Sequence, residues 1–213
     1  MSHDILINEL SSQLRPVQRR NIARETCWLA GLGGLELALV LALGTMRPDM
    51  ARAIGHPFMW WKLGSLALLV AISAFTAVRS FSPMISPRRG LSLTMILIGL
   101  AVVLGAMVGP DGSVAPTITE RLAPLHGLGC AAGIVILSLP MLGILSIFMR
   151  KGASTHAEGS ALAVGLAGGS WGAFVFAFCC PVNDPIYIVA WYSLGCASVT
   201  LMARLILPRY AAL

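Results

Sequence analysis

Six long apolar stretches separated by short connectors dominate this 213-residue sequence. Each stretch has about the 17–25 residues that an α-helix needs to cross the hydrocarbon core of a bilayer. Hydrocarbon offers the backbone no hydrogen-bond partners, so each stretch is predicted to be helical. Charged residues make up 11% of the chain, too few to cover a water-soluble domain of this size. We therefore predict an all-α, polytopic membrane protein with spans at residues 28–46, 58–78, 91–108, 125–149, 160–178 and 186–207.

Positive charge is distributed unevenly between the two sides that six spans define. One side carries 11 of the 15 lysines and arginines, in the N-terminal segment, the second and fourth connectors and the C-terminal end. The cytoplasmic side of a membrane protein is generally the side richer in these residues. Both termini are therefore predicted to be cytoplasmic. The connectors at residues 47–57, 109–124 and 179–185 are predicted to face outward.

The longest polar segment, residues 1–27, is predicted to be a cytoplasmic arm that contains a short amphipathic helix. Leu6, Leu10, Leu14 and Val17 follow one another at spacings of four, four and three residues, which places them on one helical face. A helix this short is marginally stable alone in water and needs a surface on which to bury this apolar stripe. Two surfaces suit it: the membrane interface, or a groove on a soluble partner.

Small residues recur inside the predicted spans. Residues 31–34 read Gly-Leu-Gly-Gly, and residues 165–169 read Gly-Leu-Ala-Gly-Gly. Small side chains let the backbones of two membrane helices approach each other closely. We therefore predict helix–helix contacts at both segments.

Three of the five cysteines, Cys130, Cys179 and Cys180, fall at the outward level of the predicted spans, where disulfides can form. The chain has no Cys-x-x-Cys pair and no zinc-binding spacing. The three are interpreted either as reactive thiols or as buried structural thiols. His126 lies one helical turn before Cys130 and could activate it or share a soft metal ion with it. Asp184 could act from the other side, or cap the helix that follows.

Two further residues within or beside the spans carry polar groups. Glu36 is a carboxylate deep in the first span, where an ionisable group is costly and is a candidate for function. Lys62 follows Phe-Met-Trp-Trp at the start of the second span, a pattern typical of an aromatic belt with an anchoring lysine. Two functions from other classes follow from these features: a small transporter that uses Glu36, and a membrane thiol–quinone oxidoreductase that uses the outward cysteines.

Five features in this order resemble the NrsF-type family of six-span bacterial membrane proteins. They are the leucine-rich arm that runs into Arg15-Pro16-Val17, residues 58–63 at the start of the second span, Cys130 early in the fourth, Arg150-Lys151-Gly152-Ala153 after it, and Cys180-Pro181-x-x-Asp184-Pro185 followed by Trp191-Tyr192. The resemblance covers essentially the whole chain.

The resemblance implies an anti-sigma factor, which is not an enzyme, needs no cofactor and does not itself bind nucleic acid. Such a protein holds an extracytoplasmic-function (ECF) sigma factor at the inner membrane, here through the arm, and releases it under stress. The sensing thiols of the family fall on Cys130 and Cys180, which could also hold a metal ion transiently. Cys179 stands where the family often has histidine, and it is a resolving thiol, the true partner of Cys130 or a bystander.

Overall fold

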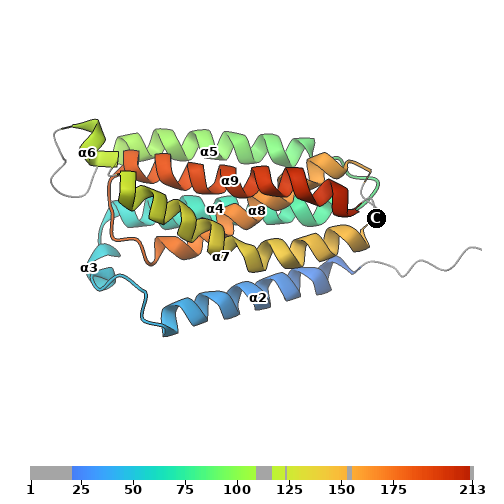
Figure 1. Ribbon diagram of the computed structural model, residues 1–213, viewed down its shortest axis with the longest axis horizontal. Helices are drawn as coiled ribbons and strands as arrows, with labels where there is room; N and C mark the ends of the chain where they lie inside the picture. The colour runs from blue at the N-terminus through green and yellow to red at the C-terminus, as the bar shows by residue number, and fades with distance from the viewer. Residues whose placement is uncertain (1–20, 109–116, 123, 153–154, 212–213) are drawn as a thin grey trace, which may run out of the picture.

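The computed structural model describes residues 21–108, 117–122, 124–152 and 155–211 (Figure 1). Within these ranges the chain is helical and contains no strand. Two short helices, α3 (Met50–Ala53) and α6 (Ile118–Leu122), lie in connections. The six-span prediction is confirmed, because the other six helices are long and apolar enough to cross a membrane: α2 (Ile22–Ala42), α4 (Pro57–Ser80), α5 (Arg88–Val108), α7 (Pro124–Lys151), α8 (Ala157–Ala177) and α9 (Pro185–Ala211).

The first helix is displaced from its predicted span of residues 28–46. α2 begins at Ile22, where the Asn21 side chain caps it by accepting a hydrogen bond of 3.2 Å from the Arg24 amide. Residues 22–27, which the sequence assigns to the arm, are therefore the first turns of the first long helix. The helix ends at Ala42, and Gly44 follows with φ of 70°, a left-handed conformation that glycine adopts without strain.

α8 forms the centre of the bundle and packs against α4, α7 and α9. Its buried residues are mostly glycine, alanine and serine. A Cβ atom at Gly165 would lie 2.6 Å from the Cα of Thr200 in α9, and one at Gly168 would lie 2.8 Å from the Leu142 side chain in α7. The predicted contacts in this segment are confirmed, since these glycines let neighbouring helices approach the α8 backbone.

α2 lies at the edge of the bundle, beside α7 (Figure 1). Its buried residues are Leu29 and Gly33, and Gly33 faces the indole of Trp171 in α8. Gly31 and Gly34 have no atom within 4 Å of the position of an added Cβ. The predicted helix contact is therefore confirmed at Gly33 and wrong at Gly31 and Gly34.

The two ends of the bundle differ in what they carry. α2 begins and α9 ends at one end, here called the terminal end (Figure 1). The connection between α8 and α9, together with α3 and α6, lies at the opposite end. This second end carries Cys179 and Cys180 and is called the thiol end.

Candidate functional site at the thiol end

The site is organised by the connection between α8 and α9. α8 ends at Ala177 and α9 begins at Pro185, which suits the first position of a helix because proline has no backbone N–H. The Asp184 carboxylate accepts a hydrogen bond of 2.9 Å from the Ile186 amide and so caps α9. This fixed start brings the first turns of α9 beside Cys180.

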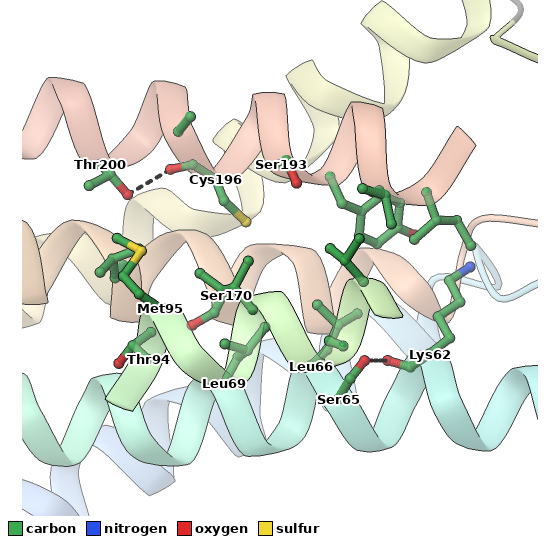
Figure 2. Close-up of a pocket in the computed structure, with 18 of the residues that line it drawn as sticks. Lys62, Ser65, Leu66, Leu69, Thr94, Met95, Ser170, Ser193, Cys196 and Thr200 are labelled. Atoms are coloured by element: carbon green, nitrogen blue, oxygen red, sulfur yellow. Dashed lines mark hydrogen bonds between the residues drawn. The ribbon is translucent and has the colours of Figure 1, made fainter. Parts of the chain in front are cut away.

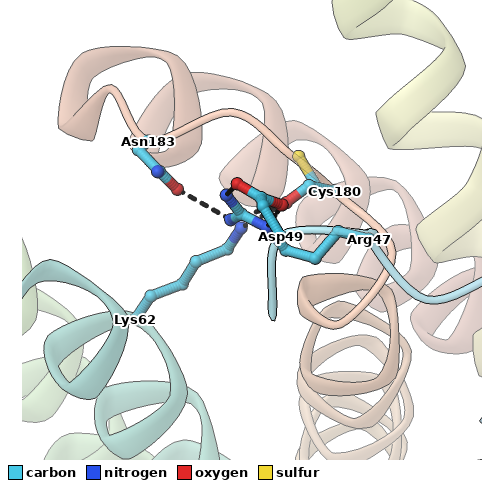
Figure 3. A network of polar contacts seen from close by, with 5 residues as sticks. All are labelled: Arg47, Asp49, Lys62, Cys180 and Asn183. Carbon is cyan, nitrogen blue, oxygen red and sulfur yellow. Dashed lines mark hydrogen bonds and ion pairs between the residues drawn. The ribbon is translucent and has the colours of Figure 1, made fainter. Parts of the chain in front are cut away.

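Two cationic side chains hold the main-chain oxygen of Cys180 (Figure 3). Lys62 Nζ in α4 donates to it at 3.3 Å, and Arg47 Nη1 donates to it at 3.5 Å. Both side chains are buried, with Arg47 2% and Lys62 1% exposed. Buried cations are rare unless they are paired. The shared hydrogen bonds of Arg47 and Lys62 to the Cys180 carbonyl therefore mark this connection as a specific polar site.

Arg47 also joins two segments that are distant in the sequence. Its guanidinium donates to both carboxylate oxygens of Asp49, at 2.7 and 2.6 Å, and to the Asn183 side chain at 2.9 Å. Its amide donates to the Phe178 carbonyl at 3.1 Å. The guanidinium lowers the pKa of Asp49 to about 2. The segment that follows α2 is thus fastened to the connection between α8 and α9.

The three thiols lie around this connection as free cysteines. Cys180 is 2% exposed and belongs to an apolar cluster on which Cys130 packs. The Cys130 sulfur lies 3.1 Å from the hydroxyl of Tyr187 in α9, another residue of that cluster. Cys179 donates to the Thr45 hydroxyl at 3.6 Å. The structure therefore brings Cys130 and Cys180 together, and it turns Cys179 toward the segment after α2.

A tryptophan in α9 fixes the position of α7, the helix that carries Cys130. Trp191 Nε1 donates a hydrogen bond of 2.8 Å to the Leu122 carbonyl just before α7. Its indole lies against Gly127, where any side chain would collide with it. Because residue 127 is glycine, the first turns of α7 can pack directly on α9. This contact lies one turn before Cys130.

The two other residues that the sequence places near the thiols lie elsewhere. His126 is exposed, and within the described part of the chain the polar partner of Cys130 is Tyr187. Asp184 forms a two-pronged ion pair with Arg121 of α6, with both distances 2.7 Å. This arginine lowers the pKa of the Asp184 carboxyl. Asp184 therefore acts as a helix cap and as an anchor for α6.

Sequence reasoning missed both buried cations. It treated Arg47 as an outward loop charge and Lys62 as the anchor of an aromatic belt. The belt interpretation holds for Trp60, which is 69% exposed, but is wrong for Phe58 and Lys62, which are buried in the bundle. A lysine placed after four apolar residues gives no local sign of its partner, because that partner is a backbone carbonyl 118 positions away.

Glu36 has a partner that the sequence did not indicate. Trp171 Nε1 in α8 donates to one of its carboxylate oxygens at 2.8 Å, while the other oxygen is buried without a partner among the described residues. Of the two remaining cysteines, Cys27 is exposed on α2 and Cys196 of α9 lies against Gly169. The residues of the apolar stripe, Leu6, Leu10, Leu14 and Val17, lie outside the described residues.

These features define the class of protein. Six long apolar helices pack around a core of small residues, as in a polytopic membrane protein. Free thiols and two buried cations form a polar site at one end of the bundle. The family model described as "Negative regulator of sigma F" matches residues 10–212. The chain therefore belongs to the NrsF family.

Two curated relatives span nearly the same length. The "Anti-sigma-F factor NrsF" of Caulobacter vibrioides (strain NA1000 / CB15N) is 32% identical over 211 residues, covering 95% of both chains. The "Probable anti-sigma-F factor NrsF" of Azospira oryzae (strain ATCC BAA-33 / DSM 13638 / PS) is 26% identical over 199 residues, covering 92% of both. No solved structure matches the chain.

Proposed function

We propose that this protein is a membrane anti-sigma factor that holds an ECF-type sigma factor and releases it when its thiols are modified. The names of its relatives support the first part. The observation that carries the mechanism is the fastening of Cys180 to the segment after α2, through Arg47. α2 connects that segment directly to the N-terminal arm, so one helix links the thiols to the region that would bind the partner.

The proposal places both termini in the cytoplasm and the bundle in the bacterial inner membrane. The terminal end carries most of the described positive charge, including Arg79, Arg150 and Arg209. The thiol end carries Arg47, Arg52, Lys62 and Arg121 among the described residues. This imbalance favours a cytoplasmic terminal end. The thiols then face the periplasm, a compartment in which disulfides persist.

The arm would bind the sigma factor through the apolar stripe of Leu6, Leu10, Leu14 and Val17. An amphipathic helix gains most of its stability by burying such a face, and a groove on the sigma factor would provide the surface. Binding there would cover a surface that the sigma factor needs for RNA polymerase or promoter DNA. The protein would act on transcription through this partner, without binding nucleic acid itself and without catalysis.

Modification of the thiols would change how the connection between α8 and α9 is held. Oxidation of Cys130 and Cys180 removes one proton from each thiol, passes two electrons to the oxidant and forms one S–S bond. The new bond would replace the contact of Cys130 with Tyr187 and draw Cys180 toward α7. A movement of the Cys180 main chain would be transmitted by Arg47 to the segment after α2. A coupling of about 1–3 kcal/mol would change the affinity for the partner about 5- to 150-fold.

The test uses full-length protein in membranes, with the bound sigma factor measured by co-purification before and after an oxidant. We expect the oxidant to release the sigma factor from the native chain and not from a Cys130→Ser, Cys180→Ser double variant. Cys196→Ser is the matched control, and it should respond like the native chain. Release from the double variant would refute the thiol mechanism.

A second variant tests the role of the arm in binding the sigma factor separately from the role of the thiols in its release. Leu10→Glu together with Leu14→Glu places charge on the apolar stripe and should abolish co-purification with or without the oxidant. The matched control is Ser11→Glu together with Ser12→Glu, which adds the same charge beside the stripe. Undiminished recovery of the sigma factor with the leucine variant would refute the role of the arm.

A further inference from the structure

Cys130 and Cys180 share one apolar cluster but differ in their access from outside the bundle. Cys180 belongs to the cluster and is 2% exposed, whereas Cys130 packs on it and is half-buried. A reagent that approaches the cluster from outside therefore meets the sulfur of Cys130 before that of Cys180. This difference predicts an order of reaction for the two thiols.

A tyrosine hydroxyl lies directly at the sulfur of Cys130. The Tyr187 oxygen is 3.1 Å from that sulfur, and the Tyr187 side chain is 2% exposed. A thiolate carries no proton, so in a hydrogen bond to ionised Cys130 the tyrosine hydroxyl must be the donor. Hydrogen bonds to ionised groups are stronger than those between neutral groups, and the thiolate is the nucleophilic form of cysteine. The contact therefore favours the reactive form of Cys130.

The start of α9 fixes the position of this hydroxyl. The Asp184 carboxylate caps the helix through the Ile186 amide at 2.9 Å, and Arg121 holds the same carboxylate at 2.7 Å. Tyr187 follows in the first turn of α9, with its ring centroid 6.5 Å from that of Trp191. A donor held by its surroundings needs little further ordering to bind the thiolate, so the contact is preorganised.

Cys196 shows that partial burial alone does not produce such a contact. This thiol is half-buried like Cys130 and lies in an apolar groove between α4, α5, α8 and α9. There the Thr200 hydroxyl donates to the main-chain oxygen of Cys196 at 2.7 Å, and not to its sulfur (Figure 2). Among the described residues, these two half-buried thiols thus differ in the contact that would stabilise a thiolate.

We propose that Cys130, activated by Tyr187, reacts first with a small uncharged peroxide, and that Cys180 then completes the disulfide. This inference rests on the proposed thiol mechanism. The Cys130 thiolate attacks one peroxide oxygen, an S–O bond forms, the O–O bond breaks, and the leaving oxygen takes the electron pair and the proton that Cys130 gave up. The product at Cys130 is a sulfenic acid. The Cys180 sulfur then attacks the Cys130 sulfur, an S–S bond forms, the S–O bond breaks, and hydroxide leaves with the Cys180 proton as water.

The depth of Cys130 limits the reagent to an uncharged molecule. Cys130 lies in the second turn of α7, roughly 9 Å along the helix from Pro124. Leu125 and Leu128 are 86% and 55% exposed on the same stretch, so the surroundings outside the bundle are apolar at this level. A charged oxidant would have to leave water to reach the sulfur, at a large desolvation cost. A neutral peroxide avoids that cost.

The test traps the sulfenic acid with dimedone in membranes that contain the full-length protein and no sigma factor. Each chain carries Cys179→Ser, so an adduct in the connection between α8 and α9 comes from Cys180 alone, and mass spectrometry locates it. Hydrogen peroxide should label Cys130 in a Cys180→Ser chain at least about tenfold faster than Cys180 in a Cys130→Ser chain. Cys196 is the internal control in both chains and should stay unlabelled.

Tyr187→Phe keeps the ring and removes the hydroxyl. In the Cys180→Ser chain it should slow the labelling of Cys130 about tenfold, the equivalent of one hydrogen bond to an ionised group. It should also raise, by about one unit, the pH at which labelling reaches half its maximal rate. Tyr192→Phe is the matched control, because it removes a buried hydroxyl of the same cluster that has no hydrogen-bond partner among the described residues. Both values should equal those of the chain with Tyr192.

Access is measured in the same Cys180→Ser chain with two maleimides. An anionic, sulfonated maleimide should label Cys130 at least about tenfold more slowly than N-ethylmaleimide, which is uncharged. Equal rates would overturn the requirement for an uncharged reagent.

Two further results would overturn the proposal. Cys180 that is labelled as fast as Cys130 would reverse or abolish the order of the two thiols, and this comparison stands even if Tyr187→Phe does not fold. Equal rates with Tyr187→Phe and Tyr192→Phe would refute activation by Tyr187. The proposed function fails separately: labelled Cys130 without release of the sigma factor by the oxidant would refute the anti-sigma mechanism and leave this chemistry intact.

Discussion

α8 and α2 are both 21-residue apolar helices, yet they are attached to the bundle in different ways. α8 is surrounded by α4, α7 and α9, and its glycines allow direct contact with neighbouring backbones. α2 buries Leu29 and Gly33 and is otherwise held by the Glu36–Trp171 contact and by the segment that follows it. Similar hydrophobicity therefore supports two roles, a fixed scaffold and a peripheral helix that is held at a few points.

The largest expected difference between the two helices is in their tolerance of added volume. Gly165→Leu in α8 forces a side chain into the backbone of Thr200, and overpacking of this kind costs about 1–3 kcal/mol or more. Gly34→Leu in α2 meets open space and should change stability by less than about 0.5 kcal/mol. Thermal unfolding midpoints in detergent measure both. Equal losses would show that α2 is packed as closely as α8.

The next largest effect should come from the attachment of the segment after α2. Arg47→Met removes four donated hydrogen bonds and should lower the free energy of unfolding by about 1–3 kcal/mol. It should also speed the labelling of Cys179 by a maleimide, because Thr45 would no longer be held beside it. Arg52→Met, at an exposed site in α3 of the same connection, is the control. Unchanged labelling with Arg47→Met would disprove this attachment.

A smaller effect is expected at the contact between the two helices. Trp171→Phe keeps an aromatic ring but removes the hydrogen bond to Glu36, and should cost about 0.5–1.5 kcal/mol. Because this contact is one of the few that hold α2, its loss should speed amide hydrogen exchange in α2 and leave α8 unchanged. Trp28→Phe, at an exposed position, should alter neither helix. Faster exchange in α8 alone would reverse the assignment of the two roles.

The smallest effect concerns pH. The pKa of Asp49 is lowered from 3.8 to about 2 by Arg47. A lowered carboxyl pKa gives stabilisation that is complete above about pH 3.8 and is lost as the pH falls through about 2. Reaction of Cys179 with dithiodipyridine should therefore rise between pH 4 and pH 2, and Asp49→Asn should remove this step. A step near pH 6 would point to a group other than Asp49.

The sequence predicts the helices well and the polar site in part. Hydrophobic length is a local property, so the six spans, the small-residue contacts of α8 and a common level for Cys130, Cys179 and Cys180 could be inferred. The pairing of Cys130 with Cys180 is an expectation from the family resemblance. Whether a glycine meets a neighbour depends on the rotation of its helix in the bundle, which is why Gly33 could not be distinguished from Gly31. The burial of Arg47 and Lys62 depends on a carbonyl at a distant position, which leaves no periodic signal.

Both cations bind the main-chain oxygen of residue 180, and every amino acid carries that oxygen. The backbone oxygen of Cys180 holds the connection between α8 and α9 in place, and the thiol of Cys180 provides its reactivity. These are therefore separate properties of one residue. Replacement of Cys180 by serine or alanine should remove the chemistry and leave the support intact. A side chain at position 180 could therefore be exchanged without loss of the hydrogen bonds from Arg47 and Lys62.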